Sequence, residues 1–128
     1  MYNNALKVQT LRNDMHFSAK ALYIKFSPFK LRPIVDVIRG KNAQEAINWL
    51  AMYRMRRAVP IKKLLDSVVA NARSLKNVAP SDLIIKDIRI DHGPTYKYFK
   101  PGAQGRANIQ KKRSSHMKIE LISIQKGV

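Results

Sequence analysis

The sequence predicts an α+β fold in which three helices pack on a small antiparallel three-stranded sheet and a long β-hairpin protrudes from the body. Apolar residues recur at helical spacing through the middle of the chain, whereas they alternate with polar residues in the segments on either side. The segment from His92 to Lys118 holds seven Lys or Arg and no Asp or Glu. It also contains too few aliphatic residues to form a core of its own.

The first strand is expected at Ala21–Phe26, where apolar and polar residues alternate. The residues expected on its buried side are Leu22, Ile24 and Phe26. Residues 1–18 show no sustained period and are interpreted as an N-terminal extension. Residues 19–128 are long enough for a single domain with one modest core.

The first helix is expected to begin after Ser27, because Pro28 suits the first helical position. Its apolar stripe is predicted to consist of Leu31, Ile34, Val35 and Ile38, with the helix ending before Gly40. Pro33 removes an amide donor and is expected to clash with the carbonyl group of Phe29. That predicts a kink or a delayed helix start.

A second, short helix is expected because Asn42 and Glu45 have the spacing of a capping pair. It should end near Tyr53, and its stripe is Ala43, Ala46, Ile47 and Leu50. Pro60 is expected to open the third and longest helix. The stripe of that helix is predicted to consist of Ile61, Leu64, Leu65, Val68, Ala72 and Leu75.

Two further strands are expected at Leu83–Asp91 and around Met117–Leu121, and their pairing predicts an extended hairpin over residues 84–122. If the first arm stays extended from Ile84 to Lys97, it reaches ~45 Å at ~3.3 Å per residue. A compact globule of this length has a diameter of roughly 36 Å. The tip of the hairpin is therefore expected to project beyond the body.

The charge of the chain favours a polyanionic partner. It has 25 Lys plus Arg against 8 Asp plus Glu, a formal net charge of +17 and a pI near 10.6. Nucleic acid is the commonest polyanion inside cells. The chain has no cysteine, which excludes disulfides and thiolate metal sites. No apolar run approaches membrane-spanning length, so no membrane partner is expected.

Two alternative functions start from other features. His92 and His116 near the hairpin base have the chemistry for general acid–base cleavage of RNA, but no carboxylate is placed to orient either ring. We therefore expect no enzymatic activity, and the scattered acids and histidines predict neither a metal nor a cofactor. A free-standing regulator that reads duplex DNA or messenger RNA through the second and third helices is the other alternative. The densest charge, however, lies on the hairpin.

Four motifs follow one another with characteristic gaps: SPFKLR at residues 27–32, ANA at 70–72, DHGPT at 91–95, and AQGRA at 103–107 followed by KRSSH at 112–116. In order and spacing they resemble the large ribosomal subunit protein 22 family, of the bacterial or organellar type. The resemblance covers roughly residues 19–124. The chain departs from the family pattern at Gly102, where an Arg is usual, and at Pro33, where an aliphatic residue is common.

The resemblance implies a structural constituent of the large ribosomal subunit. Such a protein binds ribosomal RNA, joins RNA segments during assembly and lines the nascent-peptide exit tunnel with its hairpin tip. The implied partners are large-subunit ribosomal RNA, neighbouring ribosomal proteins and the nascent peptide, and no homo-oligomer is expected. The implied location is a ribosome in the cytoplasm, with an organellar ribosome as the alternative.

In a protein of this kind, Lys and Arg side chains neutralise phosphates and release counterions. The predicted RNA-binding residues are Lys30, Arg32, Arg39, Lys41, Arg54, Arg56, Arg57, Lys62, Lys63, Lys97, Lys100, Arg106, Lys111, Lys112, Arg113, Ser115 and His116. The predicted tunnel tip consists of Tyr96, Lys97, Tyr98, Phe99, Lys100, Pro101 and Gly102. Its three aromatic residues either stack on bases or form a local cluster that holds the turn.

Overall fold

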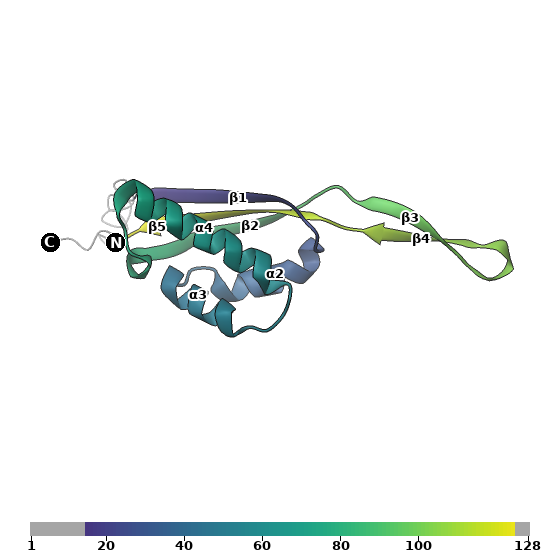
Figure 1. Ribbon diagram of the computed structural model, residues 1–128, viewed down its shortest axis with the longest axis horizontal. Helices are drawn as coiled ribbons and strands as arrows, with labels where there is room; N and C mark the ends of the chain where they lie inside the picture. Colours follow the sequence, from purple (N-terminus) through teal and green to yellow (C-terminus); the bar gives the residue numbers. More distant parts are fainter. Residues whose placement is uncertain (1–14, 125–128) are drawn as a thin grey trace, which may run out of the picture.

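The body is built around the central strand of a three-stranded sheet. The computed structural model describes residues 15–124. Its strands are antiparallel in the order β1 (His16–Ile24), β5 (Ser115–Ser123) and β2 (Leu83–His92). The helices α2 (Pro28–Ile38), α3 (Ala43–Met52) and α4 (Ala58–Lys76) cover one face of this sheet, and a thin arm leaves one end of the body (Figure 1). The predicted α+β class with three helices is confirmed.

The core lies between the helices and one face of the sheet. Every second residue of β5 is buried, which is the pattern of a strand with one covered face. The buried residues of β5 are Ser115, Met117, Ile119, Leu121 and Ser123. They meet a stripe on α4 whose members Ile61, Leu65 and Val68 have a relative exposure of 0%. This packing predicts that hydrophobic burial by α4 provides much of the stability of the body.

The opposite face of the sheet carries charges of both signs. On β2, Arg89 donates to Asp87 at 2.7 Å, and within β5 Lys118 forms an ion pair with Glu120. The hydrogen bond to Asp87 raises the pKa of Arg89, and the hydrogen bond from Lys118 lowers the pKa of Glu120. Because these cations are already paired, this face offers much less free positive charge than the arm does.

The first strand differs from its prediction in both position and face. β1 begins at His16, within the stretch that we assigned to an extension, and ends at Ile24. Ala21 lies opposite Met117 and Ile24 opposite Ser115, so β1 carries one extra residue in between. This bulge includes Tyr23, whose φ is 57°, and it leaves Leu22 60% exposed. The prediction that Leu22 is buried is therefore wrong, because the bulge reverses the alternation. Residues 1–14 lie outside the described part of the chain.

The first helix tolerates its internal proline. α2 begins at Pro28 and continues through Pro33 to Ile38, so a delayed start is wrong. Leu31, Ile34, Val35 and Ile38 are buried, as the predicted stripe requires. Pro33 itself is exposed, so its ring lies on the solvent side of the helix.

The second and third helices agree closely with the sequence analysis. Asn42 caps α3 by accepting a hydrogen bond from the amide of Gln44 at 2.9 Å, and the helix ends one residue before Tyr53. α4 begins at Ala58, two residues before the predicted Pro60, and its C-cap is Asn77 in the left-handed conformation. The predicted stripe holds as far as Ala72, whereas Leu75 in the last turn is 71% exposed.

The hairpin is interrupted where it leaves the body. β2 ends at His92, and pairing resumes only at Tyr96, in a separate two-stranded sheet. The two segments of the chain that meet at this junction approach closely, because the Gly93 amide donates to the carbonyl oxygen of Ser114 at 2.9 Å. The Ser114 hydroxyl in turn donates to the carbonyl oxygen of Pro94 at 2.6 Å. A β-carbon at position 93 would lie 2.5 Å from the Ser114 hydroxyl and 3.0 Å from its backbone carbon.

We predict that Gly93→Ala destabilises the protein by about 1–3 kcal/mol, because the added methyl group overpacks this crossing. Urea unfolding of the full chain measures the change. Thr95→Ala serves as the control, since Thr95 is an exposed residue of the same connection. A Gly93→Ala midpoint equal to that of the wild type would show that the crossing has room for a side chain.

Candidate nucleic-acid interface

The arm is a two-stranded ribbon with almost no buried surface. It consists of β3 (Tyr96–Pro101) and β4 (Ala107–Lys112), joined by the short turn η2 (Ala103–Gly105). Every residue of β3 is exposed, and so is every residue of β4 except the half-buried Gln110. An isolated two-stranded ribbon is marginally stable in water. We therefore expect the arm to be only marginally ordered when nothing outside this chain contacts it.

The register of the arm separates its side chains into two faces. On one face Lys97 lies directly opposite Lys111, and Phe99 lies opposite Ile109. Directly opposed like charges destabilise a strand pair, so the Lys97–Lys111 pair favours an anion between its ammonium groups. Phe99 and Ile109 are 67% and 57% exposed, which makes an apolar patch next to that pair.

The other face of the arm combines tyrosines with cations. Tyr96 lies opposite Lys112 and Tyr98 opposite Gln110. The ammonium group of Lys112 lies 5.3 Å from the centroid of the Tyr98 ring, within the range of a cation–π contact. Because Phe99 points to the opposite face, the three aromatic residues do not form the single local cluster that was one of our two expectations.

The turn at the tip explains the glycine at position 102. A β-carbon there would lie 3.1 Å from both the carbonyl oxygen of Arg106 and the side-chain nitrogen of Asn108. Gln104 and Gly105 then adopt positive φ values of 57° and 72°. A larger residue at position 102 would require these two neighbours to shift by a few tenths of an ångström.

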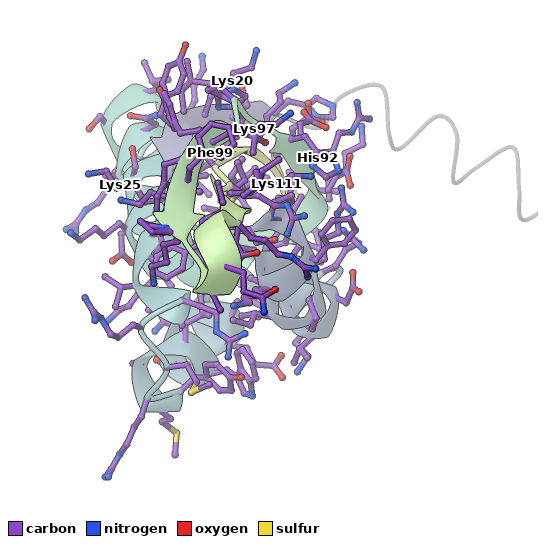
Figure 2. The ribbon with its side chains drawn as sticks, turned by 90° about the vertical axis from the view of Figure 1, so that its right-hand side faces the viewer. Lys20, Lys25, His92, Lys97, Phe99 and Lys111 are labelled. Atoms are coloured by element: carbon purple, nitrogen blue, oxygen red, sulfur yellow. The ribbon has the colours of Figure 1, made fainter. Side chains whose placement is uncertain are left out.

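The root of the arm carries further cations, one of which the sequence analysis missed. Lys25 directly follows β1 and lies beside Lys112 and Arg113 around a cavity of about 340 Å³. Viewed along the arm, Lys25 and His92 lie on opposite sides of its root, with Lys97, Phe99 and Lys111 on the arm itself (Figure 2). The signal for Lys25 was its position at the end of a strand that pairs with the strand leaving the arm.

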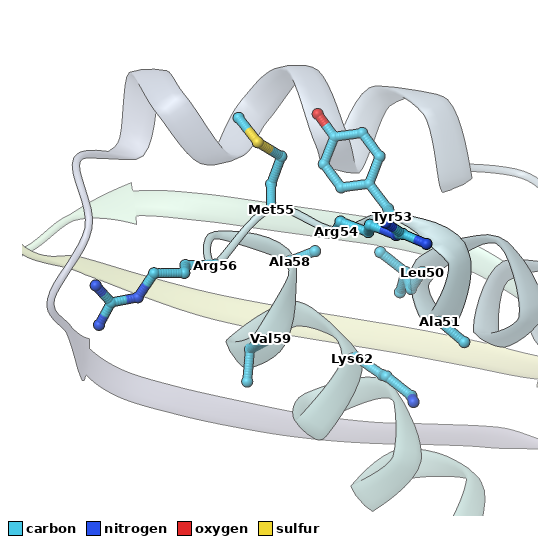
Figure 3. A pocket seen from close by; sticks show the side chains of 9 residues that line it. All are labelled: Leu50, Ala51, Tyr53, Arg54, Met55, Arg56, Ala58, Val59 and Lys62. Carbon is cyan, nitrogen blue, oxygen red and sulfur yellow. The ribbon is translucent and has the colours of Figure 1, made fainter.

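A second cationic area lies where α3 connects to α4. Arg54, Arg56 and Lys62 line a shallow pocket of about 280 Å³, together with Tyr53 and Met55 (Figure 3). Arg57 precedes α4, whose first turn contains no acidic residue. The N-terminus of a helix carries a partial positive charge from its free amide groups, so these side chains add to a field of the same sign. The connection lies toward the end of the body from which the arm leaves (Figure 1).

Two predicted contacts, one on α2 and one at its C-terminal cap, are partly engaged within the chain. Arg39 donates to the carbonyl oxygen of Ile88 at 2.9 Å and to Asp36 at 2.7 Å. Arg32 donates to the carbonyl oxygen of Ile90 at 3.2 Å. Both guanidinium groups therefore donate to carbonyl oxygens on the outer edge of β2, which has no strand beside it in the described sheet.

The remaining predicted contacts lie on the surface, with one exception. The exposed residues are Lys30, Arg54, Arg56, Lys63, Lys97, Lys100, Arg106, Lys111, Lys112 and Arg113. Arg57, Lys62 and Lys41 are half-buried, and Lys41 lies 4.0 Å from Glu45. Ser115 is 0% exposed, so we correct its assignment as a contact: it faces the core opposite Ile24.

His116 has a structural partner inside the protein. Its Nδ1 accepts a hydrogen bond from the Tyr23 amide at 3.0 Å, which supports the bulge in β1. His92 lies opposite Ser115 and His116 opposite Asp91, so the two rings emerge on opposite faces of the sheet. They cannot act on one phosphate together, which removes the geometry of a two-histidine nuclease. Within residues 15–124, no three His, Asp or Glu residues gather as metal ligands, and no helix is long and apolar enough to cross a membrane.

We predict that Lys111→Glu increases the amide protection of β3 and β4 in the free protein and weakens RNA binding. The change replaces an opposed like-charge pair with an opposite-charge pair, which stabilises a ribbon by about 0.2–1 kcal/mol. Hydrogen exchange measures the protection. Lys100→Glu makes the same reversal of charge opposite the neutral Asn108, so its protection should stay at the wild-type level. Equal gains in both variants would contradict the repulsion between Lys97 and Lys111.

A folded body with an exposed, one-sign arm is typical of proteins that insert part of their chain into nucleic acid. The comparison with protein families gives the same class: residues 19–122 match the model of ribosomal protein L22p/L17e. The chain belongs to this family. It is thus a structural protein of the large ribosomal subunit and not an enzyme.

Three relatives show how far the likeness extends, and each carries the name large ribosomal subunit protein uL22. The protein from Desulfitobacterium hafniense (strain DSM 10664 / DCB-2) is 40% identical over 85% of this chain and 96% of its own length. The one from Pelotomaculum thermopropionicum is 38% identical over 88% of this chain and 100% of its own length. The one from Synechococcus sp. (strain JA-2-3B'a(2-13)) is 40% identical over 85% of this chain and 88% of its own length.

Proposed function

We propose that this chain fastens segments of large-subunit ribosomal RNA together, with the arm lying between RNA segments and the α3–α4 connection binding a further one. The observation that carries the proposal is the exposure of all of β3 in an arm that holds cations and no carboxylate. A ribbon of this composition is ordered only when phosphates neutralise its charge.

The distribution of charge supports two separate RNA contacts. The arm and the α3–α4 connection both carry cations, while the outer face of the sheet pairs two of its cations, Arg89 and Lys118, with carboxylates. A single RNA segment on the arm alone would leave Arg54 and Arg56 without an anion. Contact at both areas lets one protein hold the segments beside the arm and a further segment in a fixed relation, which is the action expected of an assembly protein.

Affinity in this arrangement comes mainly from counterion release. Each phosphate neutralised adds about −0.7 for single strands, or about −0.9 for duplex, to the slope of log affinity against log salt. Arg side chains bind phosphate with two parallel hydrogen bonds, whereas Lys acts as a point charge. Arg106 and Arg113 on the arm are thus the stronger proposed clamps, and Lys97, Lys100 and Lys111 add charge around them.

We predict that the triple variant Lys111→Ala, Lys112→Ala, Arg113→Ala flattens the salt dependence of RNA binding by about 2 units, since about three phosphates lose their partners. Filter binding or fluorescence anisotropy over a range of salt concentrations measures the slope. The matched control is Arg73→Ala, Lys76→Ala, Lys86→Ala, which removes three exposed cations outside the proposed contacts. An equal effect of the two triple variants would mean that only net charge matters.

The tip of the arm is proposed to line the exit tunnel and to meet the nascent peptide there. The predicted tip has to be corrected at its first residues, because Tyr96 begins β3 at the root of the arm, opposite Lys112. The part of the arm farthest from the body is the turn Ala103–Gly105 (Figure 1). In support of the proposal, the exposed pair Phe99 and Ile109 lies two pairs before the last pair of the ladder, Pro101 and Ala107, and on the same face. An apolar patch near the end of a cationic ribbon suits a wall along which peptides of varied sequence pass.

The double variant Phe99→Ala, Ile109→Ala should leave the melting temperature of the free protein within about 2 °C of the wild-type value, because neither side chain belongs to the core. Ribosomes that contain the variant should assemble and should respond differently to stalling peptides or tunnel-binding inhibitors. The control is Ile122→Ala, a half-buried residue of the central sheet far from the tip. Unchanged stalling in fully assembled variant ribosomes would remove the tip from the tunnel wall.

A further inference from the structure

The root of the arm contains a cavity whose shape and chemistry suit more than a phosphate. It measures about 340 Å³ and is lined by Lys25, Tyr96, Lys112, Arg113 and Ser114. We call this the junction pocket. A volume of this order lies within the usual range for small-molecule sites, about 300–1,000 Å³.

Three segments of the chain meet to form the walls of the junction pocket. β1 ends at Ile24, opposite Ser115, which brings Lys25 next to the chain that returns from the arm. Tyr96 begins β3 directly opposite Lys112. Two hydrogen bonds hold Ser114 in place: its hydroxyl donates to the carbonyl oxygen of Pro94, and its own carbonyl oxygen accepts from the Gly93 amide. The pocket is thus part of the junction itself and not a chance gap between surface side chains.

The lining of the junction pocket combines positive charge with an aromatic face. None of its five lining residues is acidic, and Lys25, Lys112 and Arg113 take part in none of the ion pairs among residues 15–124. Tyr96 is 63% exposed, so its ring is available for stacking. Lys112 directs its ammonium group toward the Tyr98 ring at 5.3 Å, which leaves Lys25 and Arg113 as the cations nearest to an incoming anion.

We infer that the junction pocket holds a single unstacked nucleotide of the bound RNA, with its base on the Tyr96 ring and its phosphate between Lys25 and Arg113. A phosphate alone would satisfy the cations but would leave the tyrosine face uncovered, whereas a nucleotide covers both. An acidic peptide would fit the charge but would not need a flat aromatic wall. This inference rests on the proposed RNA-binding function and adds the element of the RNA that the junction recognises.

The experiment uses the full chain and three probes: a six-nucleotide single-stranded RNA, an abasic ribose-phosphate strand of the same length, and a six-base-pair RNA duplex. Tyr96→Ala should weaken binding of the single strand by about 5- to 100-fold, the effect of losing one base stacked on an aromatic ring. Tyr96→Phe keeps the ring and should stay near the wild-type affinity. Lys25→Ala should flatten the single-strand salt slope by about 0.7. Lys76→Ala, at the far end of α4, is the charge-matched control and should lower the slope less than Lys25→Ala does.

A direct readout accompanies the affinities. The ring protons of Tyr96 should shift upfield in the NMR spectrum when the single-stranded RNA binds, and they should shift much less with the abasic strand or the duplex. If the abasic strand bound as tightly as the RNA, or if Tyr96→Ala were neutral, the pocket would be a phosphate site or no site, and the inference would be wrong. The proposed function would then still stand on the arm variants. If no probe showed salt-dependent binding that the triple arm variant reduces, both would fail.

Discussion

The antiparallel pairing of β2 with β5 is the constraint on which the rest of the structure depends. It runs from the pair Leu83 and Ser123 to the pair His92 and Ser115. Since a shift of one residue in register would reverse the faces of a strand, this pairing decides that Met117 and Ile119 meet the helices while Lys118 meets solvent. It also sets the direction in which the arm leaves, because β3 follows β2 and β4 leads into β5 beyond the crossing of Gly93 and Ser114.

The body and the arm obtain their order from different sources. The body buries apolar side chains from all three helices and all three strands, so hydrophobic burial opposes the loss of chain entropy there. The arm buries almost no apolar surface: it has its ladder of backbone hydrogen bonds and the contact of Lys112 with the Tyr98 ring, and it carries Lys97 opposite Lys111. In the proposed function, the charge that destabilises the free arm is also the charge that attracts RNA. Binding would then be coupled to ordering of the arm, and part of the interaction energy would be used to order the ribbon.

Much of the body could be predicted from the sequence because its helices follow local rules. The period of α4 and the cap at Asn42 are signals contained within a few turns of chain. The errors arise where contacts between segments far apart in the sequence determine the local structure. The bulge in β1 depends on a hydrogen bond from Tyr23 to His116, 93 positions away in the sequence. Likewise, Arg32 and Arg39 appear in sequence as free cations, but the exposed edge of β2 supplies them with carbonyl acceptors.

The candidate site shows the same division between local and distant signals. The density of charge on the arm is visible in sequence, because one segment of the chain contains it. The junction pocket was not visible, since Lys25 and Arg113 come from opposite ends of the chain and meet only when β1 pairs with β5. The location of the pocket has a physical consequence. At the crossing, the ladder is interrupted between His92 and Tyr96, and the junction pocket lies beside this interruption, which is where we propose that a base enters. A ribbon with an unbroken ladder would present only its two faces to RNA, and would have no cavity in which to hold a single base.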